Sequence, residues 1–253
     1  MDTTKFKIGN TYISRTNPPN AIIRVVEAVK KGEGGYICVS NMRMVLYACE
    51  TPEYNSLMKS SFMNWPDGRP LSWCGRMWGL KDVQCTSGPS TFKMMLTNRN
   101  NELKHFLFGD TQDVLDKIVD RYKDSATIVG TYSPPFIPLE EFDFDAIEKM
   151  IRKSGANVVW TAMTAPKQDY FDKLMAQRMP DIVFIGVGRA FRISIDMIKE
   201  APDWAAKMGV GGMFIGRSKL HMRLWHYFSR TFILVWYFIK IICRRMGGRK
   251  YYE

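Results

Sequence analysis

Short β-rich segments alternate with helical patterns from about residue 35 onward, and this alternation limits the fold more than any other feature. Strands that alternate with helices are typical of βα units, which build a mostly parallel sheet with helices on both faces. We expect strands at residues 35–40, 104–108, 126–130, 156–162 and 181–186. We expect helices at residues 111–123, 145–153 and 167–177, and an N-terminal edge strand followed by a helix at residues 21–31.

The composition changes near residues 201–203, because acidic residues nearly vanish beyond this point while aromatic and basic residues accumulate. Residues 217–253 contain nine Lys and Arg against a single Glu, so they carry +8 of the chain's formal charge of +11. The preceding residues are close to neutral, which argues against a domain that coats nucleic acid with a broad basic face. We therefore expect a Rossmann-like α/β domain at residues 1–202 and a basic, amphipathic helical appendage at residues 203–253.

Within the appendage, residues 223–245 place their basic side chains along one side of a helix. This segment is long enough to span a bilayer, but Arg230 and Lys240 would each cost at least about 2.5 kcal/mol in the hydrocarbon. Lying in the interface, with the basic side toward anionic headgroups, avoids that cost. The alternative is a helix that packs its apolar side onto the domain, or onto a second subunit in a homo-oligomer.

Cysteine usage and the N-terminus indicate the compartment. The five cysteines form no C-x-x-C pair and the chain has only three histidines, which suits a reducing compartment and gives no zinc signature. The first 17 residues contain no apolar segment, so we expect no signal peptide. We therefore expect the chain to stay in the cytoplasm.

The segment Asp143-Phe144-Asp145 has the D-x-D shape that often holds a divalent metal on a diphosphate. However, Asp145 precedes Glu148 by three residues at the start of a helical pattern, which favours a helix cap. The chain also lacks the P-loop, nucleophile-elbow and zincin motifs. We therefore expect neither a metal site nor a cofactor.

Two glycine segments and one aspartate follow strands or apolar stretches. Gly186-Val187-Gly188 follows the strand at residues 181–186, and Gly109 follows the strand at residues 104–108. Glycine at a carboxyl strand end lets the backbone approach a phosphate or a base, although a tight turn is the commoner explanation. Asp67 is a candidate general base, with a turn aspartate as the alternative.

Eight short motifs together resemble one family, the WecG/TagA/CpsF glycosyltransferases of bacterial surface-polysaccharide assembly. They follow the family's order from about residue 35 to residue 230. The motifs are Ser40-Asn41, Pro66-Asp67-Gly68 with Pro70-Leu71, Gly88-Pro89, Phe106-Leu107-Phe108-Gly109, Ala165-Pro166-Lys167-Gln168, Gly186-Val187-Gly188 with Ala190-Phe191, Ala201-Pro202 with Trp204, and Arg223-Leu224-Trp225 with Tyr227.

The resemblance implies an inverting, metal-independent glycosyltransferase of polysaccharide or teichoic acid synthesis. Such an enzyme moves an N-acetylhexosamine or related hexose from a UDP-sugar to a polyprenyl-diphosphate-linked acceptor. The resemblance implies that Asp67 is the catalytic base and that the appendage attaches the enzyme to the anionic inner face of the cell membrane. The substrate-binding residues it implies are Ser40, Asn41, Gly109, Gln168, Gly186, Gly188, Arg223 and Arg230.

Several residues depart from the family pattern. Cys85 lies where the family commonly has an arginine, and Asp110 replaces a second glycine after Gly109. Arg192 and Glu200 replace an aspartate and an arginine, which suggests a charge-reversed ion pair between them. Two alternatives therefore stay open: a catalytically impaired, membrane-bound assembly partner with the same fold, and an unrelated α/β enzyme that uses a nucleotide cofactor.

Overall fold

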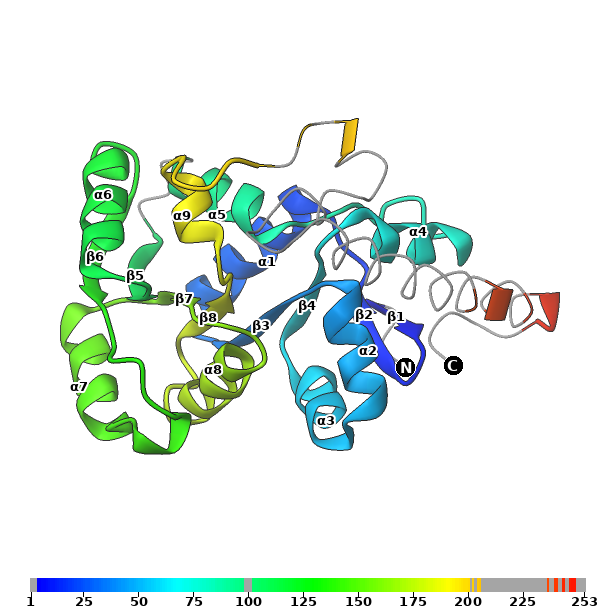
Figure 1. Cartoon of the computed structure of the whole chain (residues 1–253), viewed down its shortest axis with the longest axis horizontal. Coiled ribbons are helices and arrows are strands. Elements are labelled where there is room, and N and C mark those ends of the chain that lie inside the picture. Colours follow the sequence, from blue (N-terminus) through cyan, green and yellow to red (C-terminus); the bar gives the residue numbers. More distant parts are fainter. Residues whose placement is uncertain are drawn as a thin grey trace, which may run out of the picture.

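A six-stranded sheet in the order β4-β3-β8-β7-β5-β6 forms the centre of the computed structural model (Figure 1). The structure describes residues 4–97, 102–200, 202, 204, 205, 236, 239, 240, 243 and 246–248. All neighbouring strands of this sheet are parallel, which confirms the expected α/β class. The strands are β3 (Gly35–Ser40), β4 (Met63–Pro66), β5 (Lys104–Gly109), β6 (Thr127–Tyr132), β7 (Val158–Ala162) and β8 (Val183–Gly186).

Helices cover both faces of the sheet (Figure 1). Side chains alternate along each strand, so that Tyr36 and Cys38 of β3 pack into one core and Ile37 into the other. The first core is completed by α2 (Met42–Glu50), α3 (Pro52–Ser60), α4 (Arg69–Met77), α7 (Phe144–Ser154) and α8 (Lys167–Arg178). The second is completed by α1 (Pro18–Lys31), α5 (Gly88–Thr97), α6 (Gln112–Tyr122) and α9 (Ala190–Ser194).

The expected helices at residues 111–123, 145–153 and 167–177 are confirmed as α6, α7 and α8, each within one residue at both ends. Their apolar side chains recur at helical spacing and face the sheet or the neighbouring helices. In α6, for example, Val114 and Ile118 are buried. The apolar pattern is weaker in α8, whose buried positions also include Gln168, Asp169 and Asp172.

The N-terminal segment differs from the expected single edge strand. β1 (Lys5–Ile8) and β2 (Thr11–Ser14) form an antiparallel hairpin, which is a separate two-stranded sheet. The hairpin packs against β4, where the Asn64 N–H donates to Ser14 Oγ at 2.9 Å. The helix that follows begins at Pro18 rather than at residue 21, because the Asn17 side chain caps it and proline fits the first turn.

Most of the expected appendage, including Arg223 and Arg230, lies outside the described residues. Among those that are described, Lys240 Nζ lies 4.6 Å from the centroid of the Trp236 ring. No helix in the described parts of the chain is long and apolar enough to cross a bilayer.

Candidate active site

The carboxyl ends of the parallel strands bring most of the expected site residues to one edge of the sheet. Ser40 ends β3, Asp67 follows β4, Gly109 ends β5 and Gly186 ends β8. Gln168 lies in the first turn of α8, which follows β7. Ligands of open α/β sheets bind outside this edge, so the fold gathers these residues where a substrate is expected.

The backbone of the loop after β4 fixes Asp67. The Asp67 N–H donates to the Ser40 carbonyl oxygen at 2.8 Å, and the Gly68 N–H donates to Cys85 Sγ at 3.2 Å. Gly68 has a φ of 89°, a conformation that glycine adopts without steric cost. Cys85 therefore holds the aspartate loop through its sulfur.

The environment of Asp67 makes its carboxyl more basic than usual. Burial raises its pKa to about 6, and the positive charge of Arg189 acts in the opposite direction. The residue as a whole is half-buried. A carboxyl group with this pKa is mostly ionised at neutral pH and accepts a proton more readily than an ordinary aspartate.

Arg189 is a candidate that the sequence motifs did not single out. It directly follows Gly188 beyond the carboxyl end of β8, its side chain is exposed, and its charge acts on Asp67. A guanidinium group in this position suits an anionic substrate group such as a phosphate. The signal in the sequence was an arginine immediately after a Gly-x-Gly turn.

Gln168 holds the glycine turn after β8. Its side chain is only 5% exposed, and its Oε1 accepts a hydrogen bond from the Gly188 N–H at 3.1 Å. A β-carbon at position 186 would lie 2.8 Å from Asp172 Oδ2 and 3.0 Å from Gln168 Nε2. A side chain at position 186 would therefore press on the buried ends of Asp172 and Gln168, so close packing favours glycine here.

Two buried carboxyl groups of α8 lie beside this turn, and no sequence motif had indicated them. Asp169 accepts a hydrogen bond from the Tyr54 hydroxyl at 2.6 Å, and Asp172 accepts one from the Thr161 hydroxyl at 2.9 Å. The two aspartates are 3% and 1% exposed, respectively. Burial raises the pKa of Asp169 to about 6 and that of Asp172 well above its ordinary value.

Ser40 and Asn41 are held mainly by the fold. Ser40 is 1% exposed, and its hydroxyl donates to the Cys38 carbonyl oxygen at 3.4 Å. Asn41 caps α2, with its Oδ1 accepting a hydrogen bond from the Met44 N–H at 3.2 Å. A substrate contact by Asn41 would therefore come from its NH₂ group, whereas Ser40 contributes through its backbone to the placement of Asp67.

Gly109 is also required by its surroundings. It has a φ of 117°, and a β-carbon there would lie 2.6 Å from the Ala162 carbonyl oxygen at the end of β7. The next residue, Asp110, also adopts a positive φ, of 58°. The turn after β5 is therefore closely packed against β7.

The ion pair expected between Arg192 and Glu200 is wrong. Arg192 instead binds Asp110, with 2.8 Å between Nη2 and Oδ1, while Glu200 binds Lys93 of α5 at 2.6 Å. The reason is geometric, because Arg192 on α9 faces the end of β5, whereas Glu200 lies beyond α9 and beside α5.

The D-x-D segment caps a helix, as expected, but the capping residue is not Asp145, which the spacing to Glu148 had favoured. The capping residue is Asp143, whose Oδ1 accepts a hydrogen bond from the Ala146 N–H at 2.9 Å. Asp145 lies in the first turn of α7 and pairs with Arg178. The described residues contain no group of three or more His, Cys, Asp or Glu side chains placed to hold a metal ion.

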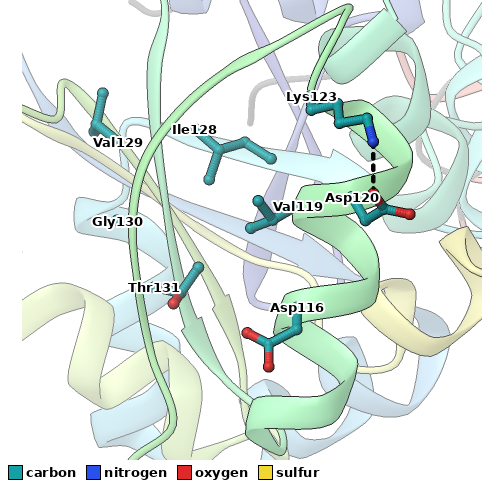
Figure 2. Close-up of a pocket in the computed structure, with 8 residues that line it drawn as sticks. All are labelled: Asp116, Val119, Asp120, Lys123, Ile128, Val129, Gly130 and Thr131. Atoms are coloured by element: carbon teal, nitrogen blue, oxygen red, sulfur yellow. Dashed lines mark hydrogen bonds and ion pairs between the residues drawn. The ribbon is translucent and has the colours of Figure 1, made fainter.

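A groove of about 480 Å³ lies between α6 and β6, with Asp116, Asp120 and Lys123 along one wall (Figure 2). Asp120 and Lys123 form an ion pair at 2.8 Å. β6 and β4 are the two outermost strands of the sheet, on opposite sides, and Asp67 directly follows β4. This groove is therefore separate from the candidate site.

These features define a Rossmann-like α/β protein with its candidate site at the carboxyl edge of a parallel sheet. The sequence matches the model of the Glycosyl transferase WecG/TagA/CpsF family over residues 6–251. The chain therefore belongs to this family and is a glycosyltransferase, as the sequence motifs indicated.

Two curated relatives are similar over most of their length. One, from Bacillus subtilis (strain 168), is 25% identical over 181 residues, which cover 70% of this chain and 69% of the relative. The other, from Bacillus spizizenii (strain ATCC 23059 / NRRL B-14472 / W23), is 22% identical over 187 residues, which cover 73% and 71%. Both are named N-acetylglucosaminyldiphosphoundecaprenol N-acetyl-beta-D-mannosaminyltransferase.

Proposed function

We propose that this glycosyltransferase moves an N-acetylhexosamine or related hexose from a UDP-sugar to a polyprenyl-diphosphate-linked sugar, with inversion at the anomeric carbon and without a metal ion. The observation that carries the proposal is Asp67, a carboxyl group with a pKa of about 6 at the carboxyl edge of the sheet. The names of the two relatives support the acceptor class, because both specify an N-acetylglucosaminyldiphosphoundecaprenol acceptor.

The proposed reaction is a single displacement. An acceptor hydroxyl oxygen attacks the anomeric carbon of the donor while the bond from that carbon to the UDP oxygen breaks. Asp67 takes the hydroxyl proton, and UDP leaves with the bonding electron pair. A general base of this kind contributes about 100-fold or more to the rate.

The leaving diphosphate gains negative charge, which nearby cations must stabilise. Arg189 supports this role because it follows the glycine turn and its charge reaches Asp67. Arg223 and Arg230 are proposed to add further positive charge from the appendage. Gln168 and the backbone at Gly109, Gly186 and Gly188 are proposed to line the donor pocket.

The basic, aromatic-rich residues 203–253 are proposed to form a separate appendage that lies on the inner face of the membrane. A lipid-linked acceptor stays in the bilayer, so its transferase has to work at the membrane surface. The net charge of +8 over residues 217–253 suits anionic headgroups.

The test is UDP release from a panel of UDP-sugars with a short-chain lipid-diphosphate-GlcNAc acceptor. We expect release with at least one donor, and about 100-fold slower turnover in Asp67→Asn with UDP affinity retained. Asp116→Asn is the matched control, because Asp116 is exposed in the groove of Figure 2. UDP binding without product from any donor would contradict the proposal and favour a non-catalytic assembly partner.

A further inference from the structure

Asp110 and Arg192 form a bidentate ion pair at the carboxyl edge of the sheet. Arg192 Nε lies 2.9 Å from Asp110 Oδ2 and 3.1 Å from Oδ1, and Nη2 lies 2.8 Å from Oδ1. The Asp110 side chain is only 8% exposed, whereas that of Arg192 is 42% exposed. A fork of this kind fixes orientation as well as distance.

The surrounding chain holds Asp110 in place. Its φ of 58° is uncommon for a residue other than glycine, although aspartate tolerates it better than most. The Ser133 hydroxyl donates to its carbonyl oxygen at 2.7 Å, and the Thr111 N–H donates to its Oδ1 at 2.8 Å. These contacts therefore hold the Asp110 carboxylate in one orientation.

The pair joins the two glycine turns of the candidate site. Both turns rest on the end of β7: Gly109 packs against the Ala162 carbonyl, and the N–H groups of Val187 and Gly188 reach the Thr161 carbonyl oxygen at 2.8 Å and 3.3 Å. Asp110 directly follows the first turn. Arg192 lies on α9, the helix that begins two residues after the second turn.

We propose that Asp110 and Arg192 are positioning residues, which set the spacing of the two glycine turns and thereby the affinity of the pocket for the nucleoside diphosphate of the donor. The inference rests on the proposed function, since it assumes that these turns line a UDP-sugar site. It assigns a role to two residues that depart from the family pattern.

A second ion pair, just beyond the end of α9, provides a comparison. Asp196, just beyond the end of this helix, also has a positive φ, of 61°, and pairs with Arg121 of α6 at 2.5 Å. Its side chain is 71% exposed and that of Arg121 is 46% exposed. This pair ties the far end of α9 to another helix and joins neither glycine turn.

The test is isothermal titration with UDP on the full chain. We expect Asp110→Asn, which keeps the tolerance for positive φ, and Arg192→Gln each to weaken UDP binding about fivefold, and the double variant to weaken it no further. We expect Arg192→Lys to weaken UDP binding almost as much as Arg192→Gln does, because lysine cannot form the bidentate contact. Arg121→Gln should bind UDP as tightly as the unmodified protein.

Transfer kinetics separate a positioning role from a general loss of stability. We expect the donor KM of the Asp110 and Arg192 variants to rise while kcat stays within about twofold. Unchanged UDP affinity in these variants, beside a lowered melting temperature, would overturn the inference and leave the proposed function intact. An unmodified protein that binds no UDP would overturn both.

Discussion

Gln168 Oε1 accepts a hydrogen bond from the Gly188 N–H at 3.1 Å, so the first turn of α8 is tied to the glycine turn after β8. The Thr161 carbonyl oxygen lies 3.3 Å from the same N–H and shares it. The glutamine proposed to touch substrate therefore also shapes the backbone of the donor pocket. Its loss should affect both stability and donor binding.

We expect Gln168→Leu to lower the free energy of unfolding by about 1–2 kcal/mol, because it buries an apolar group against a partly unsatisfied N–H and removes a partner of Asp169. UDP affinity should fall in the same variant. Urea unfolding and isothermal titration measure the two effects. Gln112→Leu on the exposed face of α6 is the control and should change stability by less than about 0.5 kcal/mol. Equal effects of Gln168→Leu and Gln112→Leu on stability would mean that the hydrogen bond from the Gly188 N–H to Gln168 does not stabilise the fold.

The pH dependence of transfer should report the ionisation of Asp67. The base works only when ionised, and its pKa is raised to about 6. We therefore expect kcat/KM to fall about tenfold for each pH unit below this value and to level off above it. In Asp67→Asn, the residual kcat/KM should no longer fall as the pH drops below about 6. An unchanged fall in the variant would assign the titration to another group.

Asp169 should make the stability of the fold depend on pH. Its pKa in the folded chain is raised to about 6, so the folded state binds the proton more tightly than the unfolded state does. The folded state is therefore favoured at low pH, and this contribution is lost as the pH rises from about 4 to about 6. Linkage allows a loss of at most about 3 kcal/mol.

The measurement is chemical denaturation of Asp169→Asn and of the unmodified protein at several pH values. The asparagine still accepts a hydrogen bond from the Tyr54 hydroxyl and carries no charge. We expect the variant to gain stability relative to the unmodified protein between pH 4 and pH 7, and the difference to level off above this range. A difference that does not change with pH would mean that Asp169 titrates normally. Asp116→Asn, at an exposed position, is expected to show no such gain.

The strands and helices with strong patterns were predictable, and the irregular elements were not. β5 and β8 are apolar runs that end in glycine, and α6 has regular apolar spacing. β4 is only four residues long, Met63–Pro66, and contains an asparagine and a proline, so no pattern indicated it. At the N-terminus a single edge strand was expected, and the pairing of β1 with β2 as a hairpin was not, because each of these strands contains at most two strongly apolar side chains.

In the candidate site, too, some residues could be predicted from the sequence and others could not. Asp67 could be selected from its loop and its resemblance to a family, and the fold places it at the expected edge. The burial of Asp169 and Asp172 could not be predicted, because their partners Tyr54 and Thr161 lie on α3 and β7. The pairing of Arg192 with Asp110 likewise joins residues 82 positions apart, and no local pattern encodes such a contact.

The basic appendage, residues 203–253, should attach the enzyme to membranes through its positive charge. We expect the full chain to sediment with vesicles that contain anionic lipid at low salt, and a chain that ends at residue 216 to stay in the supernatant. Salt at about 0.5 M should weaken binding of the full chain, because screening acts on exposed charges. Substitution of Lys240, Arg244 and Arg245 by glutamine should act in the same direction, since each basic residue near the surface contributes about 1 kcal/mol. Binding that is insensitive to salt and to these substitutions would show that the apolar side of the segment drives the attachment.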